Sequence, residues 1–158
     1  LPSSMKIKQA EICDKPVTLY DIMPTVLDLV GAPIPSTVNG ASLLPLTQGK
    51  DAPWRDVVHG EHSACYSKEE EMQFVTDGKF KYIWFPRTGR EQFFRLTEDR
   101  SESKDLIHDP SYSDVICRYR SRLIEILRER NIGLTDENGL TVQSKPIVSP
   151  EYAKRVKT

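Results

Sequence analysis

The segment Met72–Leu96 constrains the fold more than any other part of this chain (MQFVTDGKFKYIWFPRTGREQFFRL). Phe80, Tyr82 and Trp84 stand at every second position of its middle part, with more polar residues between them. This alternation is typical of a strand with one buried face. Asp77, followed by a glycine, predicts a two-residue hairpin turn before that strand, because glycine adopts positive φ at little steric cost. The segment therefore predicts an antiparallel meander.

Two flanking segments are predicted to complete this sheet and to cover it. Trp54–Ser63 (WRDVVHGEHS) predicts a fourth strand beside the meander. Asp109 and Pro110 predict the start of a helix, and apolar residues at steps of three and four from Tyr112 to Leu127 make it amphipathic. A sheet with one apolar face needs a second layer. We therefore predict an α+β fold, in which a small antiparallel sheet of about four strands is covered by a long C-terminal helix.

A second, shorter helix is predicted at Asp21–Val30. Asp21 suits the N-cap, Pro24 falls in the first turn, and Gly31 follows the last turn. The helix is apolar on nearly every side, which is typical of a helix that is buried on several sides. A chain of 158 residues offers few elements to surround it. We expect its packing partners to lie outside this sequence.

Composition and charge exclude several classes of function. The chain is 38% apolar and has a formal net charge of −1, which is typical of a globular protein without a basic field for nucleic acid. Lys79 and Lys81 alternate with the aromatic residues and are expected on the opposite face of the strand, so they do not build a basic aromatic surface. No apolar run approaches the ~20 residues of a membrane span, and the start of the chain lacks the layout of a signal peptide. Because the first residue is leucine, we expect a truncated or processed piece.

The cysteines do not indicate a reaction centre. Cys13, Cys65 and Cys117 are odd in number and widely spaced, which excludes complete internal pairing and leaves no CxxC metal pattern. Three idle thiols and one disulfide with a free thiol both remain open. Cys65 lies near His59 and His62 in sequence, but catalytic partners usually come from separate segments. We therefore assign no nucleophile.

The histidines do not predict a metal site either. His59 and His62 are three positions apart in a segment that looks extended, so their side chains point to opposite faces. The zinc-protease pattern places two histidines four apart on a helix. If the segment has a function, we favour contact of Glu61 or His62 with a polar ligand. Arg87 and Arg90 lie in the predicted turn after the middle strand and are expected to be free to reach an anion; the alternative is that they are solvated turn residues.

The order of several segments carries more information than any single motif. DIMPTVLDLVG, TDGKFKYI and FRLTEDRSESKDL follow one another between Pro16 and Gly133. Together with the segments between them, they closely resemble the C-terminal part of the sulfatase family, specifically bacterial arylsulfatases. The resemblance implies a periplasmic or secreted hydrolase of sulfuric esters. In that family the reaction depends on a formylglycine, made from Cys or Ser in a [CS]xPxR motif, and on a divalent cation, usually calcium, held by Asp and Asn.

That machinery is not found in this sequence. None of the three cysteines is followed by proline at the required place, Ser144-Lys145-Pro146 lacks the arginine, and the paired aspartates of the metal site are missing. The resemblance therefore assigns no catalytic and no metal residue here. It implies that calcium and formylglycine belong to an N-terminal α/β domain outside this sequence.

The resemblance also divides the chain. Residues 1–50 are expected to be the tail end of the catalytic domain with a connector, residues 51–133 the C-terminal sulfatase subdomain, and residues 134–158 an irregular tail. The helix Asp21–Val30 would pack on the missing domain, which explains its apolar surface. If it is left without that domain, we predict that the chain self-associates to hide residues such as Ile22, Val26 and Leu29.

We predict that this chain completes the fold and the substrate cleft of a sulfatase and is inactive alone. Glu61, His62 and Arg90 are the candidate contacts to a sulfated aryl or sugar substrate, because arginine suits anion binding. The predicted partner is the N-terminal sulfatase domain of the same protein. The alternative is a free-standing binding or assembly module without catalysis.

Overall fold

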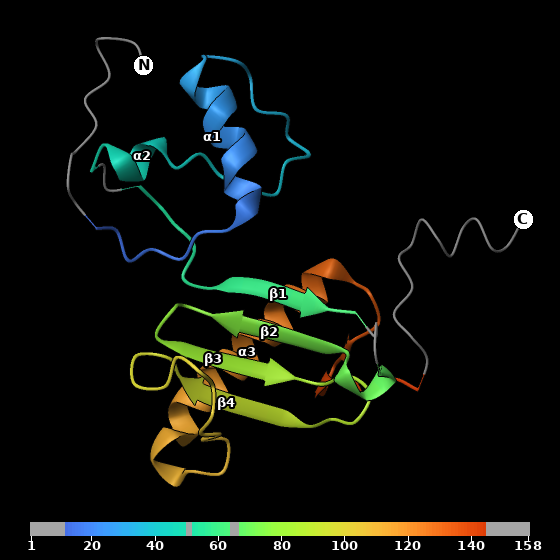
Figure 1. Cartoon of the computed structure of the whole chain (residues 1–158). Coiled ribbons are helices and arrows are strands. Elements are labelled where there is room, and N and C mark those ends of the chain that lie inside the picture. Colours follow the sequence, from blue (N-terminus) through green and yellow to red (C-terminus); the bar gives the residue numbers. More distant parts are fainter. Residues whose placement is uncertain (1–11, 50–51, 64–66, 145–158) are drawn as a thin grey trace, which may run out of the picture. The chain divides into compact units, whose positions relative to one another are not determined.

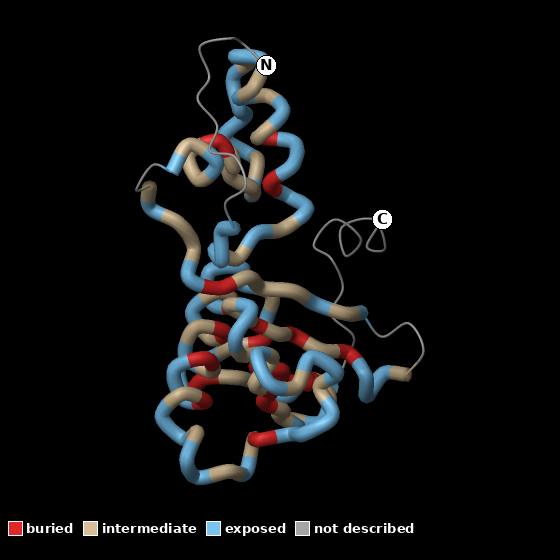
Figure 2. The backbone as a smooth tube through the Cα atoms, turned by 60° about the vertical axis from the view of Figure 1, so that its left-hand side comes forward, coloured by how far each residue is buried: buried red, intermediate tan, exposed pale blue. Residues whose placement is uncertain are grey.

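The computed structural model describes residues 12–49, 52–63 and 67–144. The chain divides into two compact units at the boundary between Val58 and His59, which we call the N-terminal unit and the C-terminal unit. Buried residues are numerous in the sheet and helix of the C-terminal unit, whereas most residues between 12 and 49 are exposed or half-buried (Figure 2). No helix within the described ranges is both long and apolar enough to cross a membrane.

The N-terminal unit is built on short helices. A 3₁₀ turn, η1 (Leu19–Asp21), leads directly into α1 (Ile22–Leu29), and α2 (Leu44–Thr47) follows after a connector (Figure 1). The helix predicted at Asp21–Val30 is therefore confirmed, and Gly31 ends it with a positive φ of 70°. The cap differs from the prediction. Thr18 accepts the hydrogen bond of the Tyr20 N–H, and the Asp21 side chain bonds back to the Thr18 N–H in a capping box.

The C-terminal unit contains the predicted four-stranded sheet. Its strands are β1 (Val58–His62), β2 (Met72–Thr76), β3 (Phe80–Trp84) and β4 (Glu91–Arg95), in the spatial order β1-β2-β3-β4. The helix α3 (Ser113–Arg130) lies across one face of this sheet (Figure 1). Short 3₁₀ turns, η2 (Lys68–Glu70) and η3 (Pro110–Tyr112), precede β2 and α3. The prediction of an α+β fold with this sheet and a long C-terminal helix is confirmed.

The hairpin between β2 and β3 is wider than predicted. Thr76 is paired with Lys81, so four residues stand between the paired positions in place of two. Asp77 is the reason, because its carboxylate accepts hydrogen bonds from the backbone N–H groups of Lys79 and Phe80 at 2.8 Å each. Gly78 takes a φ of 86°. The Asp-Gly pair does mark the turn, but the aspartate side chain, which binds the backbone two and three residues on, sets its width.

The aromatic face of the meander forms the core beneath α3, as predicted. Tyr82 and Phe93 are completely buried, and Leu123 and Leu127 of α3 are completely buried as well. The rings of Phe80 and Phe93 are stacked with their centroids 5.4 Å apart. Aromatic pairs of this kind add to the free energy that burial of apolar surface contributes.

The opposite face of the sheet is more apolar than the alternation indicated. Ile83, Phe85 and Phe94 are buried together there, and three half-buried residues pack against them, namely Met72, Phe74 and Leu96. The prediction of a mostly polar face was wrong, because the two residues that follow Lys81 on this face, Ile83 and Phe85, are apolar and buried. Lys81 itself lies over the ring of Phe74 at 4.9 Å and is paired with Glu102 at 2.8 Å.

The end of α3 is followed by regular structure. Asn131 adopts the left-handed conformation, with φ of 49°, and ends the helix. Two short strands, β5 (Thr135–Asp136) and β6 (Gly139–Leu140), then form an antiparallel hairpin. The prediction of an irregular tail from residue 134 was therefore wrong for this segment. The Asp136 carboxylate stabilises the hairpin by accepting hydrogen bonds from the N–H groups of Asn138 and Gly139.

Candidate functional site

The strand β1 places two polar side chains on the side of the sheet that α3 covers. Alternation along the strand points His59 and Glu61 to the same face, and both are hydrogen-bonded to Gln73 of β2. Gly60 between them allows close packing on the other face, since a Cβ there would lie 2.2 Å from the ring of Phe74. The predicted segment is thus an edge strand whose polar residues are already engaged with its neighbour.

Glu61 is held in an ion pair with α3. Arg130 donates from Nη1 at 2.8 Å and from Nη2 at 3.2 Å to the two carboxylate oxygens. Gln73 Nε2 donates to the same carboxylate at 3.3 Å. The hydrogen bonds from Arg130 hold the pKa of Glu61 below its usual value. Glu61 therefore remains ionised and connects the sheet edge to the end of the helix.

His59 accompanies Glu61 in this network. Its Nε2 lies 2.9 Å from the side-chain oxygen of Gln73. Burial lowers the pKa of His59, because a charged imidazolium loses hydration there. The ring is therefore neutral at pH 7.

His62 ends β1 and, by alternation, points to the face opposite Glu61. Its Nδ1 atom is buried and has no hydrogen-bond partner among the described residues. The two candidate residues of this strand therefore do not face the same environment.

The two arginines around the turn between β3 and β4 differ in accessibility. Arg87 is buried, and its Nε donates to the buried carboxylate of Glu71 at 2.7 Å. The expectation that Arg87 is free to reach an anion was therefore wrong. Arg90 lies over the ring of Phe85 at 3.7 Å and is 3.6 Å from the Glu70 carboxylate, with 47% of its side chain exposed. Of this pair, Arg90 has the exposed side chain, whereas only 6% of the Arg87 side chain is exposed.

The candidate residues are held by different elements. Glu61 is paired with α3 through Arg130, whereas Arg90 is paired with η2 through Glu70. No hydrogen bond or ion pair within the described ranges joins Arg90 to Glu61 or to His62. Whether a ligand contacts all three stays a prediction.

Two members of the Glu61 network were not found from the sequence. Gln73 has 2% of its surface exposed and sits in the inward register of β2. A glutamine at an inward position of an alternating strand was an available signal, because a buried amide requires partners. Arg130 is separated from Glu61 by 69 positions, so no local pattern indicates their contact.

The described residues do not form a metal centre or a thiol site. No three His, Cys, Asp or Glu residues in those ranges lie close enough together to hold a metal ion. Cys13 and Cys117 are free thiols and exposed. Cys65 lies outside the described residues.

The N-terminal unit carries an exposed apolar surface on η1 and α1. It is formed by residues that would normally be buried, namely Leu19, Tyr20, Ile22, Met23, Val26 and Val30. Val26 is 52% exposed at the middle of the helix, whereas Leu29 is half-buried. Large apolar patches are uncommon on the surface of monomeric proteins. We call these six residues the α1 apolar surface.

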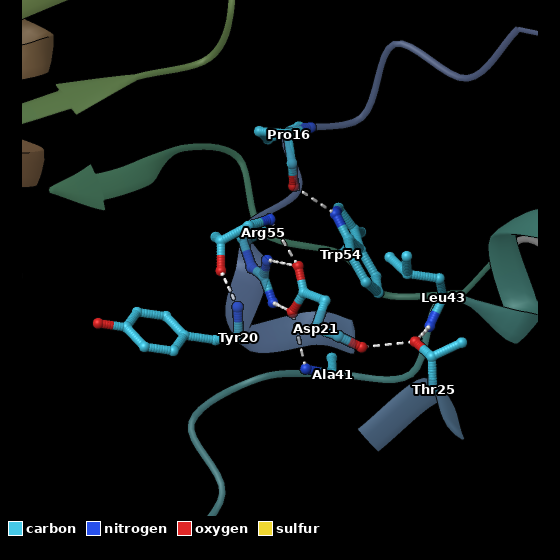
Figure 3. A network of polar contacts seen from close by, with 9 residues as sticks. Pro16, Tyr20, Asp21, Thr25, Ala41, Leu43, Trp54 and Arg55 are labelled. Atoms are coloured by element: carbon cyan, nitrogen blue, oxygen red, sulfur yellow. Dashed lines mark hydrogen bonds and ion pairs between the residues drawn. The ribbon is translucent and has the colours of Figure 1, made fainter. Parts of the chain in front are cut away.

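A buried polar network beneath this surface fixes η1 and α1 within the unit (Figure 3). The Asp21 carboxylate has no exposed surface and accepts hydrogen bonds from the N–H groups of Thr18 and Ala41 and from both terminal nitrogens of Arg55. The hydrogen bond from Arg55 is the main cause that lowers the pKa of Asp21 to about 2.

Two further contacts support the same network. Thr25 accepts from the Leu43 N–H at 2.9 Å and donates to the Asp21 carbonyl oxygen. The indole N–H of Trp54 donates to the Pro16 carbonyl oxygen at 2.9 Å. The helix that carries the α1 apolar surface is thus held within the unit by hydrogen bonds to Asp21 and Thr25.

Comparison with known proteins gives a consistent result. A family model described as N-sulphoglucosamine sulphohydrolase, C-terminal, matches residues 1–129. An arylsulfatase of Clostridium perfringens (strain 13 / Type A) is 38% identical over 136 residues, which are 86% of this chain and 28% of that protein. A Delta 4,5-hexuronate-2-O-sulfatase of Bacteroides thetaiotaomicron is 29% identical over 80% of this chain and 26% of its own length.

Solved structures show the same architecture. A 2-O GAG sulfatase superposes with a TM-score of 0.69 at 27% identity, over 89% of this chain and 31% of that one. A phosphonate monoester hydrolase from Silicibacter pomeroyi superposes with a TM-score of 0.62 at 24% identity, over 87% of this chain and 31% of that one, which shows a shared fold alone. The chain spans less than a third of the length of each of these relatives.

Proposed function

The chain belongs to the sulfatase family, in the region that the family model describes as C-terminal, and we propose that it supplies the C-terminal part of a sulfuric ester hydrolase. The observation that carries this proposal is the α1 apolar surface, on a helix that the buried Asp21–Arg55 network holds in place. Such a surface fits a partner that buries it permanently, because an obligate interface resembles the apolar core of a domain.

The proposed partner is the N-terminal catalytic α/β domain of the same protein. The similar sulfatases are more than three times as long as the part that this chain matches, so they contain such a domain-sized region outside the match. Charged residues are absent from the α1 apolar surface, whose six members are all apolar or aromatic. We propose that α1 packs on that domain and that residues 1–50 belong structurally to it, with residues 51–133 as the subdomain that follows.

The cofactors of the family do not fit the residues described here. Formylglycine requires a [CS]xPxR motif, which the sequence lacks, and no acidic or histidine cluster in the described ranges suits calcium. We propose that both belong to the catalytic domain and that this chain alone does not hydrolyse sulfate esters.

The proposed contribution of the C-terminal unit is to one edge of the substrate cleft. Arg90 supports this assignment best, because its side chain is about half exposed and arginine binds sulfate-like anions through two parallel hydrogen bonds. Glu61 and His62 remain proposed contacts from β1. The substrate class proposed is a sulfated aryl compound or sugar, and the proposed location is the periplasm or the exterior of a bacterial cell.

The test compares the chain alone with a reconstituted enzyme. The isolated chain is assayed on an aryl sulfate with calcium present, and we expect no turnover above background. Coexpression with the upstream catalytic region of the same gene, matured to carry formylglycine, should restore turnover. The substitution Val26→Glu in the α1 apolar surface should abolish assembly, whereas Val142→Glu, at an exposed valine of the C-terminal unit, should not. Turnover by the chain alone would overturn the proposal of inactivity.

A free-standing binding or assembly module remains the second candidate, since the same exposed apolar surface would suit another protein partner. The upstream gene sequence separates the two. An in-frame [CS]xPxR motif supports the sulfatase, whereas a stop codon or an unrelated domain supports the module.

A further inference from the structure

The side chain of Gln73 lies between the imidazole of His59 and the carboxylate of Glu61. Its orientation determines which ring nitrogen of His59 carries the proton. A glutamine amide has one side that only accepts hydrogen bonds and one that only donates them. The carboxylate of Glu61 accepts only, so the Gln73 NH₂ group must face it, as the 3.3 Å contact has it. The side-chain oxygen of Gln73 is then directed to His59 Nε2 at 2.9 Å.

This orientation leaves His59 one arrangement of its protons. Because the Gln73 oxygen only accepts, His59 Nε2 must carry the hydrogen and donate it. The neutral ring then has an unprotonated Nδ1, whose lone pair is an acceptor. Arg130 completes the chain of contacts, since its two hydrogen bonds to Glu61 hold the carboxylate in position.

The amide of Gln73, which lies at the centre of the network, is buried. Gln73 has 2% of its surface exposed, so its amide cannot turn over without losing both partners in a region that water reaches poorly. His59 lies on β1, which is one of the two edge strands of the sheet, and is half-buried. The Nε2 side of the ring is thus occupied inside the unit, whereas Nδ1 has no hydrogen bond to another described residue.

We infer that Gln73, oriented by the Glu61–Arg130 ion pair, holds His59 as the Nε2–H tautomer, so that its Nδ1 accepts a hydrogen bond from a hydroxyl or amide N–H of a ligand at the β1 edge. A neutral acceptor does not bind the sulfate anion, so His59 recognises the body of the substrate. Toward His59, Glu61 acts as a positioning residue through Gln73, in addition to the substrate contact proposed for it above. The inference has two halves, the tautomer of His59 and the hydrogen bond that Nδ1 accepts from a ligand. The second, the ligand half, rests on the proposed function.

The tautomer is tested on the 158-residue chain by nitrogen-15 NMR of the histidine rings at pH 7. His59 is assigned by the loss of its signals in His59→Gln. We expect Nε2 to resonate as a protonated ring nitrogen and Nδ1 as an unprotonated one. Gln73→Leu should yield a mixture of both tautomers, and Glu61→Gln should do the same, because an amide at position 61 no longer fixes the orientation of Gln73. Gln92→Leu, on β4, is the control that should change nothing.

A wild-type His59 that carries its hydrogen on Nδ1 would overturn the inference. So would an unchanged spectrum in both Gln73→Leu and Glu61→Gln. Far-ultraviolet circular dichroism shows whether each variant is folded, and the Glu61→Gln substitution keeps the argument testable if Gln73→Leu fails to fold.

The ligand half is tested in the reconstituted enzyme with two substrates, a sulfated sugar that keeps free hydroxyls and phenyl sulfate, which has none. His59→Phe should raise KM for the sugar by up to about tenfold, the effect of one lost hydrogen bond, and leave KM for phenyl sulfate unchanged. Equal KM changes for both substrates would overturn this half while the tautomer result stands. A reconstituted enzyme without any turnover would instead contradict the proposed function.

Discussion

The Asp21 carboxylate is completely buried and accepts hydrogen bonds from Arg55 Nη1 at 2.5 Å and Arg55 Nη2 at 2.7 Å, across 34 positions of sequence. The same carboxylate also binds two backbone N–H groups, those of Thr18 and Ala41. Four separate donors therefore converge on one side chain. This convergence explains how a short unit with few buried apolar residues keeps α1 in place.

Substitution of Asp21 by asparagine should destabilise the N-terminal unit. The amide keeps the shape of the side chain but loses the charge and cannot accept from both arginine nitrogens. Arg55 is 24% exposed, so in the Asp21→Asn chain its guanidinium regains part of its hydration, which limits the cost of the lost ion pair. We expect a loss of about 2 kcal/mol in the free energy of local unfolding. Hydrogen exchange of the α1 amides, followed by mass spectrometry, measures this change.

Asp28→Asn is the matched control, because Asp28 is an exposed aspartate of the same helix whose hydrogen bond is to the hydroxyl of Ser42. Its effect should stay within about 0.5 kcal/mol. Equal protection of α1 in wild-type and Asp21→Asn chains would contradict the role given to the network.

The same carboxylate predicts how the N-terminal unit responds to acid. The pKa of Asp21 is lowered from its usual 3.8 to about 2, mainly by the hydrogen bond from Arg55. A lowered pKa in the folded state stabilises the fold above pH 3.8, and this stabilisation is lost as the pH falls through 2. The difference in α1 protection between wild type and Asp21→Asn should therefore be full at pH 6 and should shrink between about pH 5 and pH 2. A difference that stays constant over this range would show that the charge of Asp21 is not responsible.

Removal of the ring of Phe93 should destabilise the C-terminal unit strongly. Phe93 is completely buried, stacked on Phe80 and 5.9 Å from the ring centre of Tyr119 on α3. Phe93→Ala leaves a cavity in the core and should cost about 3–5 kcal/mol. Urea denaturation followed by circular dichroism measures the change. Ser121→Ala, on the exposed side of α3, is the control and should change the free energy of unfolding by less than about 0.5 kcal/mol. An equally small effect of Phe93→Ala would contradict the role of Phe93 in the core.

The α1 apolar surface predicts self-association of the isolated chain. Ile22 is 54% exposed, and it lies one helical turn from Val26 on the same side of α1. We expect sedimentation velocity to show species that grow with protein concentration. The double substitution of Ile22 and Val26 by glutamate should restore a monomer, whereas Val142→Glu should not. A wild-type chain that is monomeric at all concentrations, with α1 still protected from exchange, would contradict this prediction.

The candidate site shows where sequence patterns stop being informative. Alternation placed His59 and His62 on opposite faces of one strand, and the turn residues before Arg90 identified the turn. It did not reveal that Arg87 is buried against Glu71, because the two residues are 16 positions apart and both would be solvated in an ordinary loop. It also did not reveal Gln73 as the residue that orients His59. Each of these relationships depends on pairing between segments, which a single sequence does not display.

Local chemistry in the sequence determined the strands, the amphipathic α3, the apolar α1 and the aromatic layer between sheet and helix, since the spacing of apolar residues and the capping residues act within a few positions. The tertiary structure alone decided which polar groups are satisfied and by what. The buried carboxylate of Asp21 required Arg55, whereas the half-exposed carboxylate of Glu61 is paired with Arg130, 69 positions away. A buried charge is stable only beside a specific partner, and folding, which brings distant segments together, supplies that partner.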